Sequence, residues 1–362
     1  MIFTDRLIDR AGRERIPLIG NFELSPLCNF SCSMCYVRRG SAEVRAMGGL
    51  QSAETWLSLA KAARDAGTLW LTLTGGEPFL FPNFLELYEA LSALGLVLSI
   101  NSNGALIDER AMAVLRRCRP KRINLTLYGA SPKTYEAVTG DPEGYHRVMD
   151  TVARLRRDGI RFRFNCSLTK QNARELPQMV ALAKANNAVI EVASYMFPPR
   201  RCGKSERSAD CLSPQEAGER AANAMLLRLP EDAFERYAAS MQRVAPPPEE
   251  HGEGLEMACR AGRCSYWVNW QGEITPCGMM DIPKRDLKNQ PFAPAWADIV
   301  EEVNALRCLN GCSACPNRRL CKPCAAGVLC ETGTFQGRPE YKCKMLLAEA
   351  AACNTIMKER SK

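Results

Sequence analysis

Histidine, long apolar runs and a glycine-rich nucleotide motif are scarce or missing in this chain of 362 residues. Only two histidines are present, His146 and His251, so few residues are available to complete a mixed cysteine–histidine zinc site. No apolar run approaches the ~20 residues of a membrane-spanning helix. The first ten residues, MIFTDRLIDR, are charged where a secretory signal would be apolar. We therefore expect a cytoplasmic protein with no membrane partner.

A strong charge of either sign is also missing. The 48 Lys and Arg residues against 40 Asp and Glu give a formal charge of +8, which is mild for this length. This excess offers little support for a nucleic-acid partner, and we expect none. Hydrophobic residues (46%) and charged residues (24%) are in ordinary proportion for a folded protein. The length suggests two domains, or one large barrel with an appendage.

Cysteine, in contrast, is abundant, with 18 copies. In a long chain without a secretory signal, this number indicates metal or redox chemistry rather than a disulfide scaffold. Three cysteines lie together at Cys28, Cys32 and Cys35, and eleven lie between Cys259 and Cys353. The uneven spacing predicts two metal-binding regions separated by a stretch that binds none.

That intervening stretch alternates between apolar runs and segments of helical period. The predicted strands are 20–26, 69–74, 96–101, 122–127, 162–169 and 188–195, and the predicted helices are 52–66, 82–94, 107–118, 145–158 and 172–186. Repeated βα units favour an α/β barrel or an open sheet, and the pattern alone leaves a doubly wound sheet open. No GxGxxG follows the first strand, so a dinucleotide site has no local support.

Helix starts and stops are marked at several positions. Asn172 with Glu175, and Ser213 with Glu216, each fit a capping box. A long helical pattern runs from Ser213 to about Arg243, and three prolines at 246–248 end it before the cysteine-rich region.

The first three cysteines have the spacing Cys-x3-Cys-x2-Cys, directly after the first predicted strand. Three thiolates can hold three irons of a four-iron cluster and leave the fourth iron open to a substrate. A zinc knuckle or buried free thiols are the alternative interpretations.

The segment CNFSCSMCY resembles the cluster loop of radical S-adenosylmethionine (SAM) enzymes, in which the open iron chelates SAM and a 5′-deoxyadenosyl radical is formed. A second motif, Gly75-Gly76-Glu77-Pro78, ends the second strand and resembles the GGEP motif of that family, where the backbone and the Glu face the SAM amino group. The resemblance implies that Cys28, Cys32 and Cys35 bind the cluster. It implies SAM contacts for the motif residues and for Tyr36, Asn101, Ser102, Asn103 and Thr126. Tyr128 stands where relatives often have Asp, and Asn165, Thr169 and Tyr195 are weaker candidates.

The later cysteines resemble a SPASM domain, a C-terminal extension with two auxiliary [4Fe–4S] clusters. The resemblance assigns Cys259, Cys264, Cys277 and Cys324 to one cluster, with Cys330 as a rival for Cys324, and Cys312, Cys315, Cys321 and Cys343 to the other. Residues 266–277 read as a β-hairpin with Gly272 in its turn. Two four-cysteine zinc sites remain an alternative from spacing alone.

The resulting expectation is an α/β enzyme with a partial (β/α)6 TIM-like barrel followed by a small cysteine-rich SPASM domain. Its expected parts are an N-terminal extension (1–19), the barrel (20–205), a bridging helix and linker (206–255), the SPASM domain (256–350) and a C-terminal tail (351–362). The expected cofactors are SAM and three [4Fe–4S] clusters.

The resemblance implies an oxidoreductase or maturase that acts on a peptide or protein, with a thioether or carbon–carbon crosslink as the leading product. Alternatives are formylglycine formation in sulfatases, peptide epimerisation, and maturation of a tetrapyrrole or other non-peptide cofactor precursor. An iron–sulfur or zinc scaffold without SAM chemistry is the alternative of a different class. Expected partners are a reductant such as flavodoxin or ferredoxin and a separate leader-binding protein. Cys166, expected near the barrel interior, is a candidate hydrogen-atom donor.

Overall fold

The computed structural model describes residues 3–200, 207–248, 252–257 and 259–360. At its centre is one sheet of nine strands in the order β6-β5-β4-β3-β2-β1-β7-β8-β9. The strands are β1 (Ile19–Glu23), β2 (Trp70–Thr74), β3 (Val97–Ser102), β4 (Arg122–Thr126), β5 (Phe162–Ser167), β6 (Ile190–Ala193), β7 (Ser265–Val268), β8 (Glu273–Thr275) and β9 (Arg285–Asp286). The six strands β1–β6 run parallel, which confirms the predicted partial (β/α)6 barrel.

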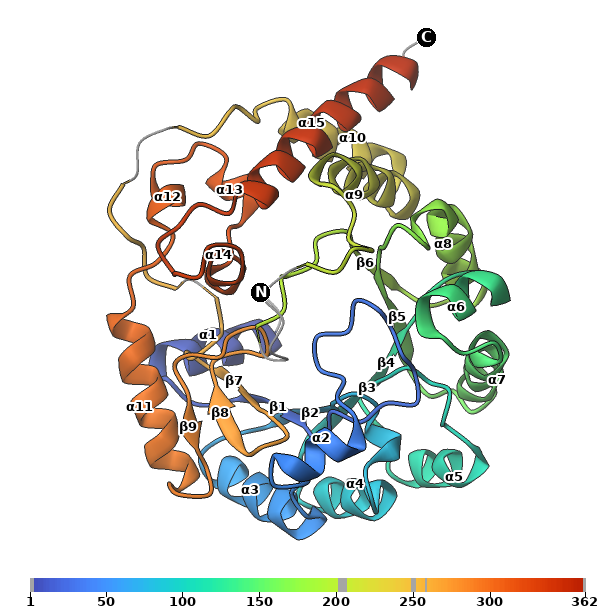
Figure 1. Cartoon of the computed structure of the whole chain (residues 1–362), viewed down its shortest axis with the longest axis vertical. Coiled ribbons are helices and arrows are strands. Elements are labelled where there is room, and N and C mark those ends of the chain that lie inside the picture. Colours follow the sequence, from blue (N-terminus) through green and yellow to red (C-terminus); the bar gives the residue numbers. More distant parts are fainter. Residues whose placement is uncertain (1–2, 201–206, 249–251, 258, 361–362) are drawn as a thin grey trace.

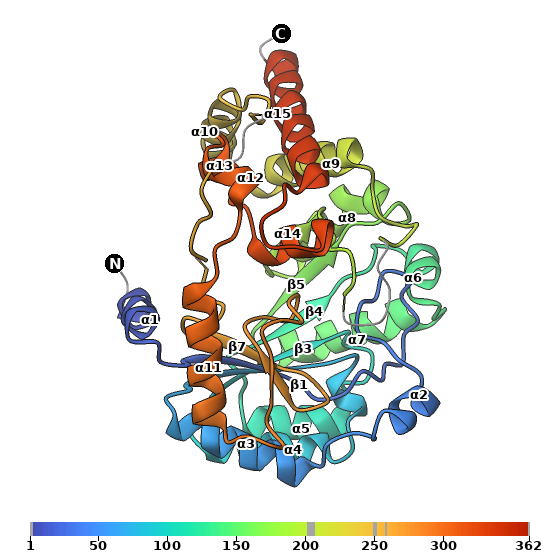
Figure 2. The ribbon, with the colours of Figure 1, turned by 60° about the vertical axis from the view of Figure 1, so that its left-hand side comes forward.

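Helices cover the outer side of the curved sheet and one end of the molecule (Figure 1). Those before β6 are α1 (Phe3–Glu14), α2 (Ser41–Ala46), α3 (Ala53–Asp65), α4 (Phe84–Ala93), α5 (Glu109–Arg117), α6 (Pro132–Thr139), α7 (Gly144–Arg157) and α8 (Leu176–Ala185), with 3₁₀ turns η1 (Pro78–Leu80) and η2 (Ala173–Glu175). Those after β6 are α9 (Pro214–Arg228), α10 (Glu231–Met241), α11 (Phe292–Ala305), α12 (Asn310–Ser313), α13 (Arg318–Cys321), α14 (Ala325–Thr332) and α15 (Glu340–Arg360). Figure 2 shows α9, α10 and α15 packed together at the end opposite α3 and α4.

Side chains alternate between two environments along the central strands. In β3, Leu98 and Ile100 are buried, whereas Ser99 and Asn101 on the other face are only partly covered. The apolar face packs against the surrounding helices and forms the core. The polar face lines the barrel interior, where a ligand can meet it.

The predicted hairpin is confirmed and lies beside the barrel. β7 pairs antiparallel with β8, and Gly272 in the connection has φ +89°, a conformation that favours glycine. β7 also pairs in parallel with β1, so the first part of the cysteine-rich region extends the barrel sheet. The limits of the separate domains remain a prediction.

Several local expectations need correction. The long pattern from Ser213 is two helices, since Pro230 separates α9 from α10, although the Ser213–Glu216 capping box is present. The Asn172–Glu175 capping box is wrong, because the Asn172 amide bonds to backbone groups of Tyr128, Ser167 and Thr169 instead. Residues 351–360 belong to α15 rather than to a tail. No helix among the described residues is long and apolar enough to cross a membrane.

Candidate active site

The loop between β1 and α2 holds Cys28, Cys32 and Cys35. Its backbone is fixed at one end by Ser31 N, which donates to Thr139 O at 2.7 Å. Burial raises the pKa of the Cys28 thiol to about 11 and that of Cys32 to about 12. The thiols are therefore protonated near neutral pH, and loading a metal on them must release protons.

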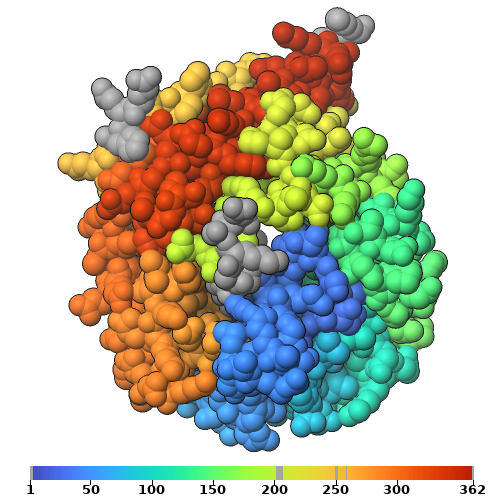
Figure 3. Space-filling view, viewed as in Figure 1, coloured from blue at the N-terminus to red at the C-terminus, as the bar shows by residue number. Residues whose placement is uncertain are grey.

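One cavity of about 460 Å³ brings most of the predicted SAM site together. Its lining includes the three cysteines with Tyr36, Gly75, Gly76, Asn101, Ser102, Asn103 and Thr126. These residues come from the carboxyl ends of neighbouring parallel strands, the edge at which α/β barrels place their chemistry. Figure 3 shows a hollow near the centre of this face, between the blue segment after β1 and the yellow-green segment after β6.

Gly75 and Gly76 are required by a close backbone approach. A Cβ at Gly75 would lie 2.4 Å from Ser25 O, and one at Gly76 would lie 2.3 Å from Leu27 O. Gly76 N donates to Ser25 O at 2.7 Å, and Glu77 N donates to Leu27 O at 2.9 Å. The motif after β2 thus holds the segment that leads into Cys28.

The Glu77 carboxylate has a different position from the one expected. It is fully buried and accepts hydrogen bonds from Ser102 Oγ (2.8 Å), Asn103 N (2.7 Å) and Phe79 N (3.2 Å). Burial raises its pKa to about 7 in spite of these donors. Glu77 and Pro78 are absent from the cavity lining, because the carboxylate instead joins the ends of β2 and β3. The expectation that this side chain faces SAM is not met.

Asn103 links the strand end to the cysteine loop. Its amide nitrogen lies 2.8 Å from Asn29 Oδ1 and 3.7 Å from Cys28 Sγ. Tyr128, which replaces the Asp of many relatives, hydrogen-bonds Cys32 through its hydroxyl, and its ring meets Phe30 edge-on at 5.8 Å. Both side chains therefore support the loop.

The sequence singled out only part of the lining. The structure adds Asn124, Ser167, residues 196–200, Gly278, Met279 and Cys330, and it includes the weaker candidates Asn165 and Tyr195. Asn101, Asn124 and Asn165 lie on the polar face of three neighbouring strands. The alternation of side chains along each strand could have identified them from the sequence. Asn165 Oδ1 is buried with no hydrogen-bond partner among the described residues, so it is available to a ligand donor.

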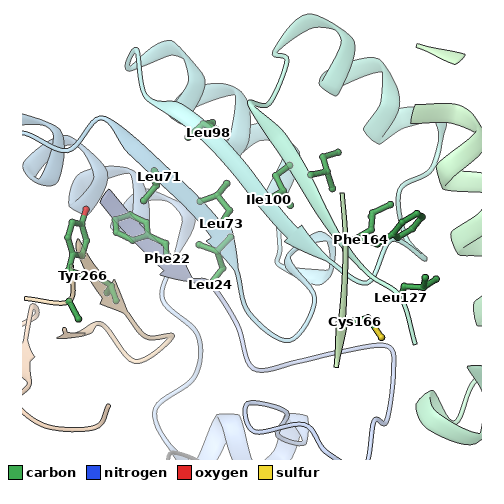
Figure 4. Close-up of a cluster of buried hydrophobic side chains, with 14 of the residues drawn as sticks. Phe22, Leu24, Leu71, Leu73, Leu98, Ile100, Leu127, Phe164, Cys166 and Tyr266 are labelled. Atoms are coloured by element: carbon green, nitrogen blue, oxygen red, sulfur yellow. The ribbon is translucent and has the colours of Figure 1, made fainter. Parts of the chain in front are cut away.

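Cys166 does not lie where it was expected. It is buried on the opposite face of β5 from Asn165, and its Sγ lies 3.6 Å from Met179 Sδ of α8. Figure 4 shows it among the apolar side chains between sheet and helices. Strand alternation directs it into the core, so its expected position in the barrel interior is wrong.

The cysteine-rich region forms two groups of thiols. Cys312, Cys315, Cys321 and Cys343 line one small cavity, which brings together the whole set predicted for one auxiliary cluster. Cys259, Cys277 and Cys324 are close enough for their charges to influence one another. Cys264 is apart from this group, since it packs with Ala11 and Leu18 beside α1. In the described residues, no three Cys, His, Asp or Glu side chains are already arranged to hold a metal ion.

Residues 22–183 match the family model of the Radical SAM superfamily. These residues form a radical SAM domain. It is 23% identical over 342 residues to an AdoMet-dependent heme synthase of Methanosarcina barkeri, covering 90% of this chain and 96% of that protein. It is 28% identical over 306 residues to a PqqA peptide cyclase of Rhizobium meliloti, covering 83% and 78%.

Among solved structures, Streptococcus suis SuiB bound to its precursor peptide SuiA has the same fold, with a TM-score of 0.67 at 18% identity over 93% of this chain and 79% of that one. A radical SAM domain implies SAM and one [4Fe–4S] cluster as cofactors. The residues of the cavity fit them, because three thiols offer three iron ligands and Asn165 offers a free acceptor.

Proposed function

We propose that this radical SAM enzyme modifies a peptide and closes a thioether or carbon–carbon crosslink. One observation carries the proposal. The lining of a single cavity combines the three cysteines and the strand ends with Met279 and Cys330 of the cysteine-rich region. A substrate in this cavity would meet both the SAM site and a region rich in potential electron acceptors. The similarity to a peptide cyclase supports a peptide as that substrate.

In this proposal Cys28, Cys32 and Cys35 hold the cluster, and the polar strand ends hold SAM. The backbone of Gly75 and Gly76, together with Tyr36, would contact the end of SAM that lies nearest the cluster. Polar groups for the rest of SAM would come from Asn101, Ser102, Asn103 and Thr126. When bound, the cluster and SAM supply hydrogen-atom abstraction from an unreactive carbon. The chain itself orients the ligands and keeps bulk water from them, because the strand-end residues Ser102 and Asn103 are buried.

The substrate side of the cavity is mainly apolar, with Tyr195, Phe197 and Met279 in its lining. Arg200 lies at the same place, where its guanidinium binds Asp281 (2.9 Å) and Leu329 O (3.3 Å). A peptide can insert one side chain here while its remaining residues stay outside.

The geometry disfavours formylglycine formation. That role is expected to use an acid directly after Cys277, where this chain has Gly278. A Cβ at Gly278 would lie 3.0 Å from the Trp267 ring, so the position has little room for a carboxylate side chain. The nearest downstream acid, Asp281, is already paired with Arg200.

We further propose a SPASM domain with two auxiliary [4Fe–4S] clusters. Cys312, Cys315, Cys321 and Cys343 would hold one, and Cys259, Cys277 and Cys324 would supply three ligands of the other. A crosslink removes two hydrogens from the peptide, one as an atom and one as a proton plus an electron. The auxiliary clusters would supply an acceptor for that electron. A flavodoxin or ferredoxin is the proposed reductant, and a separate protein is proposed to bind the leader peptide.

A second candidate follows from the match to the heme synthase, which spans almost the full length of both chains. In that case the substrate is a tetrapyrrole precursor rather than a peptide. Arg200, which lines the cavity, would then exchange its pairing with Asp281 for a substrate carboxylate.

The test begins with anaerobic reconstitution. Iron and sulfide analysis should give about twelve iron atoms per chain for three four-iron clusters. Dithionite and SAM should yield 5′-deoxyadenosine, and this product should disappear in the Cys28/Cys32/Cys35→Ala variant. Zinc without sulfide would contradict the assignment.

The substrate class is then separated by mass spectrometry. Short cysteine-containing peptides encoded beside the gene, and a porphyrin carrying propionates, are offered in parallel. Loss of two hydrogens from a peptide supports the first proposal, whereas a change in the mass of the porphyrin with the peptides unchanged supports the second.

A further inference from the structure

The group formed by Cys259, Cys277 and Cys324 lacks its expected fourth cysteine, because the Cys264 side chain lies on another face of the chain. Cys264 N donates to Arg260 O, and its carbonyl accepts from Ile19 N at 2.9 Å, which extends the pairing between β7 and β1. Two residues later, Tyr266 points at Phe292 and Trp296 of α11. Alternation along the strand therefore directs Cys264 to this outer face, where its Sγ lies 4.0 Å from a Cβ built at Gly12.

A different cysteine approaches the group from the other direction. Cys308 pairs with Leu255 in an isolated antiparallel bridge, with hydrogen bonds of 2.7 and 2.9 Å between their backbones. The bridge brings Cys308 beside the segment that leads into Cys259. The thiol is completely buried, and its charge would interact with both Cys259 and Cys324.

The backbone after Cys308 is also unusual. Leu309 has φ +63°, a left-handed conformation that residues other than glycine adopt rarely. Its N–H donates to Phe335 O, and its carbonyl accepts from Cys312 N. This turn separates Cys308, beside Cys259, from Cys312, which lines the cavity of the second group. This short turn thus connects the two groups of thiols.

Cys330 is less suitable for this position. Its thiol lies 3.5 Å from Met279 O, lines the main cavity and has Arg200 and Asp281 as its strongest charged neighbours. It therefore belongs to the substrate side.

We propose that Cys259, Cys277, Cys308 and Cys324 bind the auxiliary iron–sulfur cluster next to the barrel, and that Cys264 is a structural thiol. This inference rests on the proposed auxiliary clusters. Four thiolates complete the coordination of such a cluster. The hydrogen bond from the Cys308 thiol to Leu255 O, at 3.3 Å, is weak enough to be given up.

The experiment uses the full chain carrying Cys28/Cys32/Cys35→Ala, so that only auxiliary iron remains, about eight atoms per chain. One further substitution is added to this parent protein in each variant: Cys308→Ala, Cys264→Ala or Cys330→Ala. Cys353→Ala, at a buried thiol of α15, is the control. Iron, sulfide and the EPR spectrum of the reduced protein are measured. We expect Cys308→Ala alone to lose about four irons or to change the spectrum of one cluster.

Addition of a small thiol to the Cys308→Ala protein tests ligation directly, because an external thiolate can occupy the vacated position. Restored iron or a restored spectrum supports the inference even if the variant is less stable. Loss of iron in Cys264→Ala or Cys330→Ala but not in Cys308→Ala overturns it. Full iron in all variants, or failure of the thiol to restore the Cys308→Ala protein, also overturns it. Absence of iron in the parent variant instead contradicts the auxiliary clusters themselves.

Discussion

Gly76→Ala tests whether the backbone contact between the motif after β2 and the cysteine loop sets the SAM site. A Cβ at Gly76 would lie 2.3 Å from Leu27 O, whereas real Cβ contacts are essentially never under 3.0 Å. The two segments would have to separate by about 0.7 Å (3.0 − 2.3). Because Leu27 directly precedes Cys28, this displacement reaches the first cluster ligand.

The expected magnitude follows from the hydrogen bonds at this contact. Gly76 N donates to Ser25 O at 2.7 Å, and Glu77 N donates to Leu27 O at 2.9 Å. Weakening both costs about 1–3 kcal/mol. This cost corresponds to a loss of SAM affinity by a factor of roughly 5 to 150. Gly76 is not among the residues with positive φ, so the close approach is the main source of the cost.

Gly40→Ala is the matched control, because a Cβ there meets nothing within 4 Å and its φ of −77° suits any residue. Equilibrium dialysis of SAM and the yield of 5′-deoxyadenosine are measured on both anaerobically reconstituted variants. A Gly76→Ala protein that binds SAM as well as the Gly40→Ala protein would refute the reasoning.

Three further predictions concern the surroundings of the site. Glu77→Gln should remove a pH dependence of the protein's stability. The pKa of Glu77 is about 7 in the folded protein and ~4.3 in the unfolded chain, so the native state holds the extra proton and the free energy of unfolding falls as pH rises between these values. Thermal midpoints of both proteins, measured across this pH range, will show the difference. Glu331→Gln should lower the thermal midpoint by several degrees. The Glu331 carboxylate is buried (7% exposed), accepts a hydrogen bond from Tyr195 Oη at 2.6 Å and pairs with Arg207 at 3.2 Å. An unchanged midpoint would contradict this account. Cys166→Ala should keep full turnover while losing about 1 kcal/mol of stability, and loss of turnover in a folded protein would return the thiol to the chemistry.

The strands and the residues at their ends were the most predictable part of the enzyme. Each of the six strands lies within a few residues of its expected range, because short apolar runs between helical segments have few other folds open to them. The motif residues then share one edge of the sheet automatically, since parallel strands all end there. Pattern and topology together predict that Cys28 and Gly76 lie at the same edge of the sheet, and both line one cavity.

The direction of single side chains was the least predictable part, although strand alternation carried information about it. Cys264 matched the spacing of a family pattern, and Cys166 was expected near the barrel interior, yet both side chains point away from the predicted sites. Cys264 has the parity of Tyr266, and Cys166 that of Phe164, and these two aromatic residues are fully buried against helices. A spacing fixes how many residues separate two thiols, whereas the face of the strand decides whether they meet.

Long-range contacts were not predictable from any local pattern. Arg207 stacks on Tyr341 at 3.9 Å and pairs with Glu331, which joins the segment after β6 to α14 and α15. Tyr341 Oη donates to Leu212 O at 2.7 Å and adds a further connection. These contacts depend on how the C-terminal helices return to the barrel, and they help to position Tyr195 at the cavity.

The polar row on the inner face of the strands determines which groups a ligand of the cavity would meet there. Asn124 Oδ1 accepts from Arg122 and Arg163, and its amide donates to Asn101 Oδ1 at 2.6 Å, so these groups are engaged with one another. Asn165, beside Thr126 in the ladder, has a buried oxygen without such a partner. A buried acceptor left unpaired costs about 1–3 kcal/mol, which a ligand donor at this point would recover. The strand ends that line the cavity therefore favour a ligand rich in hydroxyl or amino groups, whereas Phe197 and Met279 in the same lining offer apolar contacts.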